Sequence, residues 1–262
     1  MTSKPAVLVT GASSGIGSVY ADRFAKRGHD LVLVARDAVR LASLAERLRS
    51  ETGVSVDIVQ ADLTEAADLA RVEARLREDS RIGVLVNNAG AAGHGGFLDQ
   101  SPEQAADLIS LNVTALTRLA SAVAPRFVQS GTGAIVNIGS VVGLAPEFGM
   151  ATYGATKAFV LFLTQGLHLE LGPKGVYVQA VLPSVTRTEI WERSGRDVDA
   201  LPAVMETAEL VDAALVGFDR RETVTIPPLP DASQWGDFDA ARQAMVPNFM
   251  QAHAAERYRA AA

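Results

Sequence analysis

A strand pattern, a glycine-rich turn and a helix pattern follow one another at the start of the chain. The stretch AVLVT, Ala6 to Thr10, is apolar enough to be a strand buried on both faces. GASSGIG then leads into SVYADRFAKRG, a helix pattern that Gly28 can end. The backbone N–H groups of such a turn and the positive end of its helix together bind an anion such as a diphosphate. The start of the chain therefore predicts a phosphate-binding turn around Gly11, Gly15 and Gly17. Many strand-to-helix connections need glycine only for its backbone freedom, and this structural interpretation stays open.

Strand and helix patterns keep alternating after this turn. Further strand patterns cover residues 31–35, 54–60, 83–86, 133–139, 175–182 and 222–226, with helix patterns at 38–52, 64–76 and 209–218, from Ser101 onward and up to about Leu171. This alternation predicts an α/β fold, a doubly wound parallel sheet with helices on both faces. The 262 residues fit a single domain, 1–262, including a lid at about 185–206 and a C-terminal helical tail at about 233–258.

Composition excludes several classes of function. The net charge of −6 gives no basic field for nucleic acid, and the absence of cysteine removes disulfides and thiolate metal sites. We expect no metal, because no cluster of metal-binding residues stands out. The segment before the first turn is too short for a signal peptide, and we expect no apolar run of membrane-spanning length. The sequence thus predicts a cytoplasmic protein with neither nucleic acid nor membrane as a partner.

Ser140 to Lys157, SVVGLAPEFGMATYGATK, carries the strongest chemical pattern. Tyr153 and Lys157 are four residues apart in a helix pattern, so their side chains project from nearly the same face. An ammonium beside a phenol favours the phenolate, and we expect Lys157 to lower the pKa of Tyr153 from about 10 toward neutrality. Tyr153 is therefore a candidate acid and base, and Ser140 can hold a substrate oxygen near it. A buried tyrosine, a solvated lysine and a loop serine are the structural alternative.

Polar residues follow several of the predicted strands. Arg36 comes directly after the second strand, where dinucleotide folds contact the adenosine ribose, and it favours a 2′-phosphate contact helped by Ser13 or Ser14. A surface ion pair with no ligand role is the alternative. Asp62 can accept from an adenine amino group or act as a helix N-cap. In the NNAG stretch, the small residues let a ligand approach the backbone and the amides can tie strands together. Asn112 is polar amid the apolar LISLNVTAL and needs partners, within a kinked helix or through water.

The order TGASSGIG, NNAG, Asn112, Ser140 and Y-x-x-x-K, from about Pro5 to Thr188, closely resembles the short-chain dehydrogenase/reductase family. The resemblance implies a Rossmann-like fold with a seven-stranded parallel sheet, a nicotinamide cofactor and self-association as a homodimer or homotetramer. It also implies a catalytic set, Asn112, Ser140, Tyr153 and Lys157. The residues that match its cofactor site are Gly11, Ser13, Ser14, Gly15, Ile16, Gly17, Arg36, Asp62, Leu63, Asn88, Ala89, Gly90, Tyr153, Lys157, Pro183, Thr186 and Thr188. Ser184 stands where the family commonly has glycine, which makes the backbone path beside the nicotinamide less certain.

The expected activity is hydride transfer between NADP(H), with NAD(H) as the second choice, and a ketone or secondary alcohol. Two alternatives are weighed against it. A serine hydrolase is disfavoured, because GSVVG is not the G-x-S-x-G elbow and the chain has four histidines, of which His94 lies in a loop near the expected pocket. A non-catalytic dinucleotide-binding sensor or scaffold of the same fold is the other. The loop 91–97, residues 141–150 and the lid are expected to shape the substrate pocket.

Overall fold

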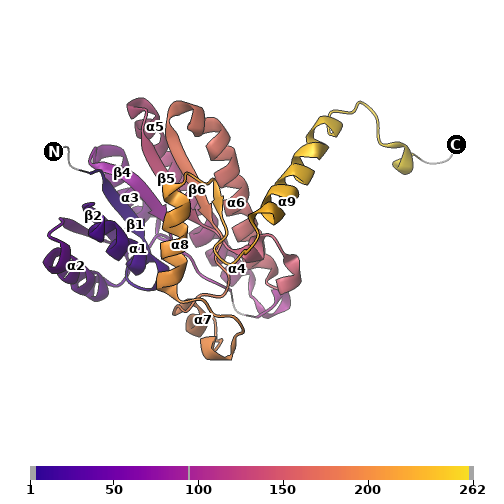
Figure 1. The fold of residues 1–262 in the computed structure, drawn as a ribbon. Coiled ribbons are helices and arrows are strands. Elements are labelled where there is room, and N and C mark those ends of the chain that lie inside the picture. The colour runs from indigo at the N-terminus through magenta and orange to yellow at the C-terminus, as the bar shows by residue number, and fades with distance from the viewer. Residues whose placement is uncertain (1–3, 94, 260–262) are drawn as a thin grey trace. The chain divides into compact units, whose positions relative to one another are not determined.

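A central parallel sheet organises the protein. The computed structural model describes residues 4–93 and 95–259. The sheet has seven strands in the order β3-β2-β1-β4-β5-β6-β7, and all neighbours are parallel. The strands are β1 (Ala6–Thr10), β2 (Leu31–Ala35), β3 (Val56–Gln60), β4 (Ile82–Asn87), β5 (Gly133–Ile138), β6 (Val176–Val181) and β7 (Val224–Thr225). The predicted doubly wound sheet is confirmed (Figure 1).

Helices cover both faces of this sheet, and each face has its own apolar core. In one core, Phe24, Leu41 and Leu215 pack on the strands, and in the other Leu76 and Phe127 do so. The strands are buried on both faces because helices lie above and below them, which explains their nearly unbroken apolar sequences. The helices of the first face are α1 (Gly15–Lys26), α2 (Ala38–Thr52) and α8 (Thr207–Asp219), and those of the second include α3 (Ala66–Glu78), α5 (Leu116–Ser130) and α6 (Ala151–Leu171).

Between β3 and β4 the chain crosses from one edge of the sheet back to its centre, and later strands are added on the other side of β1. The first three strands run outward from β1 to β3, and β4 then returns to pair with β1 on its other side. Open α/β sheets bind their ligands outside the carboxyl ends of the strands at such a reversal. The glycine turn after β1 and the NNAG stretch after β4 both lie at this edge. The topology therefore brings together two of the motifs that the sequence singles out.

The predicted long helix after Ser101 is divided into three parts. Ser101 accepts from the Gln104 N–H and caps α4 (Pro102–Ile109), with Pro102 at the first position as predicted. A π-helical segment covers residues 110–115 and continues into α5. By length and composition alone, the combined stretch 102–130 could cross a membrane, so the expectation that no apolar run is long enough was wrong. Leu119, Val123 and Phe127 from this stretch belong to the core of the second sheet face, as in the core helix of a globular domain.

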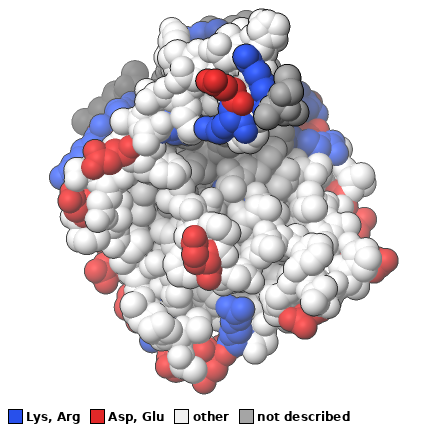
Figure 2. Space-filling view, turned by 90° about the vertical axis from the view of Figure 1, so that its right-hand side faces the viewer, with Lys and Arg blue, Asp and Glu red and all other residues white. Residues whose placement is uncertain are grey.

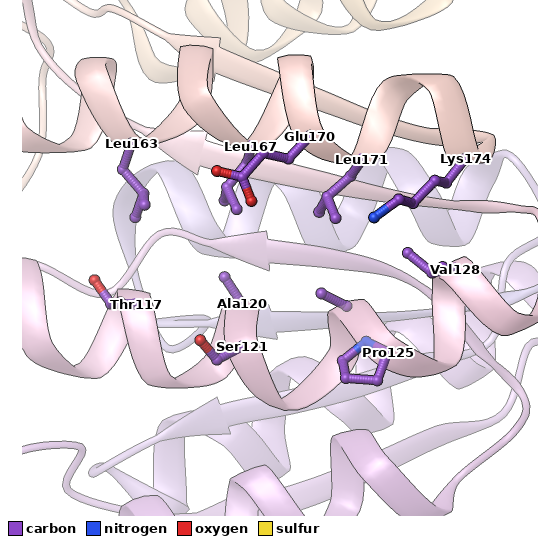
Figure 3. Close-up of a pocket in the computed structure, with 11 residues that line it drawn as sticks. Thr117, Ala120, Ser121, Pro125, Val128, Leu163, Leu167, Glu170, Leu171 and Lys174 are labelled. Carbon is purple, nitrogen blue, oxygen red and sulfur yellow. The ribbon is translucent and has the colours of Figure 1, made fainter.

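A surface groove of about 380 Å³ lies between α5 and α6. Figure 3 shows side chains of the two helices pointing toward each other across it, with Leu163, Leu167 and Leu171 from α6 facing Ala120 and Pro125 of α5. The α6 surface also exposes Phe162 and Leu169. None of the residues that line the groove is a predicted catalytic or cofactor residue. The groove is therefore separate from the motif-bearing edge of the sheet.

Residues 228–262 form a second compact unit. Its described part contains α9 (Ala232–Met245), which Asp231 caps by accepting from the Ser233 N–H. The rings of Trp235 and Phe238 pack with their centroids 5.6 Å apart, yet no residue of α9 is buried. The helical content lies where the sequence predicts it. Docking of this tail onto the domain or onto another subunit stays a prediction.

Charged side chains are unevenly spread on the surface. On the face drawn in Figure 2, most residues carry no charge, and Lys and Arg are interspersed with Asp and Glu without forming a broad basic patch. A mixed, sparse distribution of this kind gives no extended positive field for a phosphate backbone. The absence of nucleic acid as a partner stays a prediction.

Candidate active site

Four predicted catalytic side chains come from neighbouring elements at one edge of the sheet. Ser140 follows β5, Tyr153 and Lys157 lie one turn apart near the start of α6, and Asn112 lies in the π-helical segment. All four are buried, with exposures between 1% and 9%. The Lys157 Nζ lies 5.6 Å from the centre of the Tyr153 ring and donates to the Ile138 carbonyl oxygen at 2.9 Å. The phenol and the ammonium are therefore neighbours, as their spacing in the sequence predicts.

Burial controls the acidity of this pair. It raises the pKa of Tyr153 to about 12, and a hydrogen bond with Ser140 opposes the rise only in part. Burial also lowers the pKa of Lys157 to about 8. The predicted shift of the Tyr153 pKa toward neutrality is therefore wrong for this arrangement. Burial removes the hydration that stabilises a phenolate, and this effect exceeds that of the hydrogen bond with Ser140.

Asn112 is held by two partners that the sequence does not identify. Its Oδ1 accepts from the Ala91 N–H, and its Nδ2 donates to the Ala91 carbonyl oxygen, both at 2.9 Å. The same Nδ2 donates to the Thr156 Oγ1 at 3.1 Å. The helix is irregular at Asn112, because a π-helical segment surrounds this residue, and a kink there stays a prediction. The side chain joins the loop after β4 to the first turns of α6.

The glycine turn has the close packing that a phosphate-binding turn needs. Gly11 and Gly15 have φ angles of +63° and +54°, which favour glycine. A Cβ on Gly17 would lie 2.4 Å from both the Asn88 Nδ2 and the Gly11 carbonyl oxygen. Ser14 precedes α1 as its N-cap residue and makes no side-chain capping bond. The N–H groups at the start of this 12-residue helix are therefore uncapped by Ser14 and face the edge of the sheet.

The two asparagines of NNAG tie strands together, as the sequence suggests. Asn87 donates to the Asn137 Oδ1 on β5 at 3.0 Å. Asn88 donates from its Nδ2 to the Thr10 carbonyl oxygen at 2.8 Å, and its N–H donates to the Thr10 Oγ1 at 2.9 Å. The Ala89 N–H donates to the same hydroxyl at 3.0 Å. The ends of β1, β4 and β5 are thereby fixed relative to one another.

Arg36 and Asp62 meet after β2 and β3. The Arg36 Nη1 lies 3.6 Å from the Asp62 carboxylate, and the Arg36 side chain is 68% exposed. Asp62 also accepts from the N–H and the hydroxyl of Thr64. Burial is the largest single effect on the Asp62 pKa and raises it, but the hydrogen bonds from Thr64 and the charge of Arg36 together lower this pKa below its ordinary value. The N-cap of α3 is Glu65, so the alternative that Asp62 caps this helix is wrong. Leu63 is buried beside this pair.

Comparisons with known proteins agree with this geometry. The family model described as short chain dehydrogenase matches residues 5–199. The chain belongs to the short-chain dehydrogenase family. A solved short-chain dehydrogenase from Sphingobium yanoikuyae in complex with NADPH is 71% identical, with a TM-score of 0.96 over 97% of this chain and 100% of that one.

Two further relatives show how widely the family match extends. The bulky-bulky ketone specific alcohol dehydrogenase from Comamonas testosteroni is 61% identical, with a TM-score of 0.93 over 99% of this chain and 100% of that one. The very-long-chain 3-oxoacyl-CoA reductase of Anas platyrhynchos is 35% identical over 188 residues, which are 70% of this chain. The match covers about 60% of the length of that curated relative.

In this short-chain dehydrogenase, the segment that leads into the predicted lid packs against Ser140 and the glycine turn. The Pro183 carbonyl oxygen accepts from the Val141 N–H at 3.0 Å and from the Ser140 Oγ at 3.3 Å. A Cβ on Gly15 would lie 3.0 Å from the Thr188 Cγ2, so Thr188 packs on the glycine turn. Ser184 is not among the described residues with a positive φ, and the serine therefore fits the backbone without strain.

The lid itself is a loop closed at its base. Thr186 forms a parallel bridge with Met205, and the Trp191 Nε1 donates to the Thr186 carbonyl oxygen at 2.8 Å. The lid contains the short helix α7 (Ile190–Arg193). Arg40 on α2 donates to both carboxylate oxygens of Glu189, at 2.7 and 2.8 Å. Mobility of the lid stays a prediction.

An apolar cluster lies beside the Tyr153 phenol. Leu108 and Met150 pack with Tyr153, and Ala91, Ala92 and Val142 lie against them. Ala91, Ala92, Val142 and Met150 come from two of the regions expected to shape the pocket, the loop 91–97 and residues 141–150, whereas Leu108 comes from α4. His94 lies outside the described residues.

Two residues of this short-chain dehydrogenase site were missed. Thr10 accepts two N–H groups of the NNAG segment through one hydroxyl. Thr156 accepts from Asn112 and donates to the Tyr153 carbonyl oxygen at 2.7 Å. Thr10 is the last residue of a strand and Thr156 lies inside a helix, and both depend on partners far away in the sequence, so no local signal distinguishes them.

Proposed function

We propose that this short-chain dehydrogenase transfers hydride between NADP(H) and a ketone or secondary alcohol. The observation that carries the proposal is the buried group of Ser140, Tyr153 and Lys157 beside the glycine turn. A phenol, a hydroxyl and an ammonium suit proton transfer to and from a carbonyl oxygen. Support also comes from the 71% identical relative with bound NADPH and the 61% identical ketone-specific alcohol dehydrogenase.

The residues at the sheet edge fit a nicotinamide dinucleotide. The contact distances at Gly11 and Gly17 leave no room for a side chain, so the backbone at the turn is open to a diphosphate. A Cβ on Gly90 would lie 3.1 Å from the Asn112 Oδ1 and 3.6 Å from the Lys157 Nζ, so Gly90 allows close approach to the catalytic ammonium. The exposed Arg36 supplies the cation for a 2′-phosphate, and Arg–phosphate contacts are often bidentate. We therefore assign NADP(H) as preferred and NAD(H) as possible.

Each catalytic residue has a distinct proposed role. The bound cofactor supplies or accepts the hydride at the substrate carbon. Ser140 donates to the carbonyl oxygen and orients it, and Tyr153 gives its phenolic proton to that oxygen during reduction. In alcohol oxidation Tyr153 takes a proton back, which its raised pKa favours once the phenolate has formed. Lys157 binds the cofactor ribose and replaces the lost proton, and its lowered pKa of about 8 makes proton release accessible near neutrality. Asn112 fixes the π-helical segment and holds a water on the proton path.

The substrate that fits best is a ketone with apolar arms. Leu108, Met150 and Val142 present apolar surface next to the Tyr153 phenol. Phe97 and Phe148, in two of the regions expected to shape the pocket, are 68% and 59% exposed and offer further apolar surface. An apolar or aromatic carbonyl compound gains from contact with such surface.

The main test measures the reduction of a panel of ketones and aldehydes by wild type and by Tyr153→Phe. The oxidation of NADPH is the readout. We expect wild type to turn over and the variant to lose about 10²- to 10⁴-fold in kcat, because the general acid is gone. NADPH affinity in Tyr153→Phe should stay within about threefold, since the phenol hydroxyl is one contact among many. A non-catalytic dinucleotide sensor would bind NADPH but oxidise it with none of the carbonyl compounds. A near wild-type rate in Tyr153→Phe would reject the assignment of the acid.

Self-association is proposed through the groove between α5 and α6. The exposed Phe162 and Leu169 and the leucines of the groove give α6 an unusually apolar outer surface for a monomer. A second copy presenting the same helices would cover it by two-fold symmetry. Sedimentation of Phe162→Glu against wild type tests this, with a monomer expected for the variant. An intracellular location also stays a proposal.

A further inference from the structure

The lid carries three arginines, and one of them has no acidic partner. Arg187 pairs with two lid carboxylates, and Arg193 pairs with Glu189. Across residues 4–93 and 95–259, no ion pair is formed by Arg196. Its Nη1 lies instead 3.8 Å from the Sδ of Met150. A thioether is a weak acceptor, so this half-buried guanidinium retains most of its hydrogen-bonding capacity.

Met150 places this cation at the substrate pocket. The methionine is buried and packs in one cluster with Tyr153 and Leu108. Arg196 therefore contacts, through Met150, the same apolar cluster that holds the Tyr153 phenol. The intervening surface is apolar. A substrate carbonyl held at Tyr153 would place its next apolar group against Leu108 and its far end near the guanidinium.

A half-buried guanidinium without a counter-ion is costly, and a carboxylate can offset that cost with two parallel hydrogen bonds. We propose that Arg196 binds the carboxylate of an aryl keto acid, in which an aromatic ring separates the carboxylate from the reacting carbonyl. The inference rests on the proposed ketone reductase activity and names a substrate class within it. The ring lies against Leu108 and Met150, the carbonyl oxygen meets Ser140 and Tyr153, and the carboxylate meets Arg196.

The test compares two ketones of nearly equal shape, 4-acetylbenzoate and 4-acetylbenzamide, with saturating NADPH. We expect wild type to prefer the carboxylate in kcat/KM by about tenfold or more, the range expected for a charge-assisted hydrogen bond. Arg196→Gln should abolish that preference, mainly through a higher KM for the carboxylate, and leave the amide within about threefold. Arg196→Lys should keep part of the preference, because a lysine keeps the charge but loses the planar fork.

Arg193→Gln is the matched control, because it removes the same charge from the same lid at a side chain that is paired with Glu189. It should keep the wild-type preference for the carboxylate. An unchanged preference in Arg196→Gln, or an equal loss in Arg193→Gln, overturns the assignment. If wild type reduces the amide but shows no preference for the carboxylate, the role of Arg196 is overturned and the proposed reductase activity stands. No reduction of either ketone by wild type would instead count against the proposed function, and the substrate class would fall with it.

Binding can be measured without turnover. In Tyr153→Phe loaded with NADPH, calorimetric titration of 4-acetylbenzoate should give an affinity that falls about tenfold or more when Arg196→Gln is added. Raising the salt concentration should weaken this binding in Tyr153→Phe more than in the double variant, because screening acts on the ion pair. Equal affinities and equal salt dependence in the two proteins would overturn the role of Arg196.

Discussion

The Asn112 Nδ2 donates to the Thr156 Oγ1 at 3.1 Å, and that hydroxyl donates to the Tyr153 carbonyl oxygen at 2.7 Å. A single threonine thus connects the π-helical segment to the turn of α6 that carries Tyr153 and Lys157. Thr156 is 3% exposed, so neither bond can be exchanged for one with bulk water. It is a positioning residue, acting on the catalytic groups through the backbone and through Asn112.

Replacing Thr156 with valine should separate positioning from folding. Thr156→Val keeps the shape but leaves the Asn112 Nδ2 without this acceptor, which costs about 1–3 kcal/mol of stability. We expect kcat to fall about tenfold, since small misplacements of catalytic groups are costly. Thr156→Ser keeps the hydroxyl and should have the kcat and the pH profile of the wild type. A folded Thr156→Val with wild-type kcat would exclude the positioning role.

The buried Lys157 should make stability depend on pH. Its pKa is about 8 in the folded protein against an ordinary 10.5, so the native state releases the proton first as pH rises. The destabilisation is therefore complete below about pH 8 and disappears toward pH 10.5. Lys157→Met should be more stable than wild type at pH 7, by up to about 3 kcal/mol, although it is inactive. The raised pKa of Tyr153 acts in the opposite direction only above its ordinary value of 10.0.

Urea denaturation of both proteins between pH 7 and 9.5 checks this prediction. The difference in unfolding free energy between Lys157→Met and wild type should shrink steadily as pH rises. Lys174→Met removes an exposed lysine and should show no such trend. A difference that stays constant with pH would contradict the burial effect on the Lys157 pKa.

Arg36 should decide between phosphorylated and unphosphorylated cofactor. Arg36→Ala removes the exposed cation beside Asp62 and should raise the dissociation constant of NADPH about 10- to 100-fold, with that of NADH within about threefold. Fluorescence titration with each cofactor measures both values. Arg77→Ala removes an arginine that pairs with Glu73 and should leave both unchanged. Equal losses for the two cofactors would place the 2′-phosphate elsewhere.

Gly17 should tolerate no side chain. An added Cβ would lie 2.4 Å from the Asn88 Nδ2 and from the Gly11 carbonyl oxygen, so one of them must move. Gly17→Ala should therefore weaken NADPH binding by at least about tenfold and lower the melting temperature. Gly166→Ala, in the middle of α6 with no atom within 4 Å of the added carbon, should instead stabilise the protein by about 0.5–1 kcal/mol. Calorimetry and NADPH titration of the two variants test the contrast.

Local sequence signals predict the elements well where caps define them. The strands at Ala6–Thr10 and Leu31–Ala35 and the helix at Ala38–Thr52 have the predicted limits. The helix is bounded by Asp37, which accepts from the Arg40 N–H, and by Gly53 at a φ of +74°. The motif residues also converge at one sheet edge, because parallel strands bring their carboxyl ends together.

Other features depend on contacts that no local pattern encodes. The π-helical segment exists where Asn112 meets Ala91 and Thr156, residues distant in the sequence. The raised pKa of Tyr153 follows from the depth of its burial, which outweighs the hydrogen bond with Ser140. The ion pair of Arg40 with Glu189 joins residues 149 positions apart, and neither shows a distinguishing sequence signal.

The contact between Thr188 and Gly15 joins the predicted lid to the glycine turn. The first residues of the predicted lid rest on the turn that we propose binds the diphosphate, with the Thr188 Cγ2 only 3.0 Å from where a Gly15 side chain would begin. A nucleotide bound at that turn would therefore contact the residues that lead into the predicted lid. Nucleotide first and carbonyl compound second is the kinetic order that such an arrangement favours.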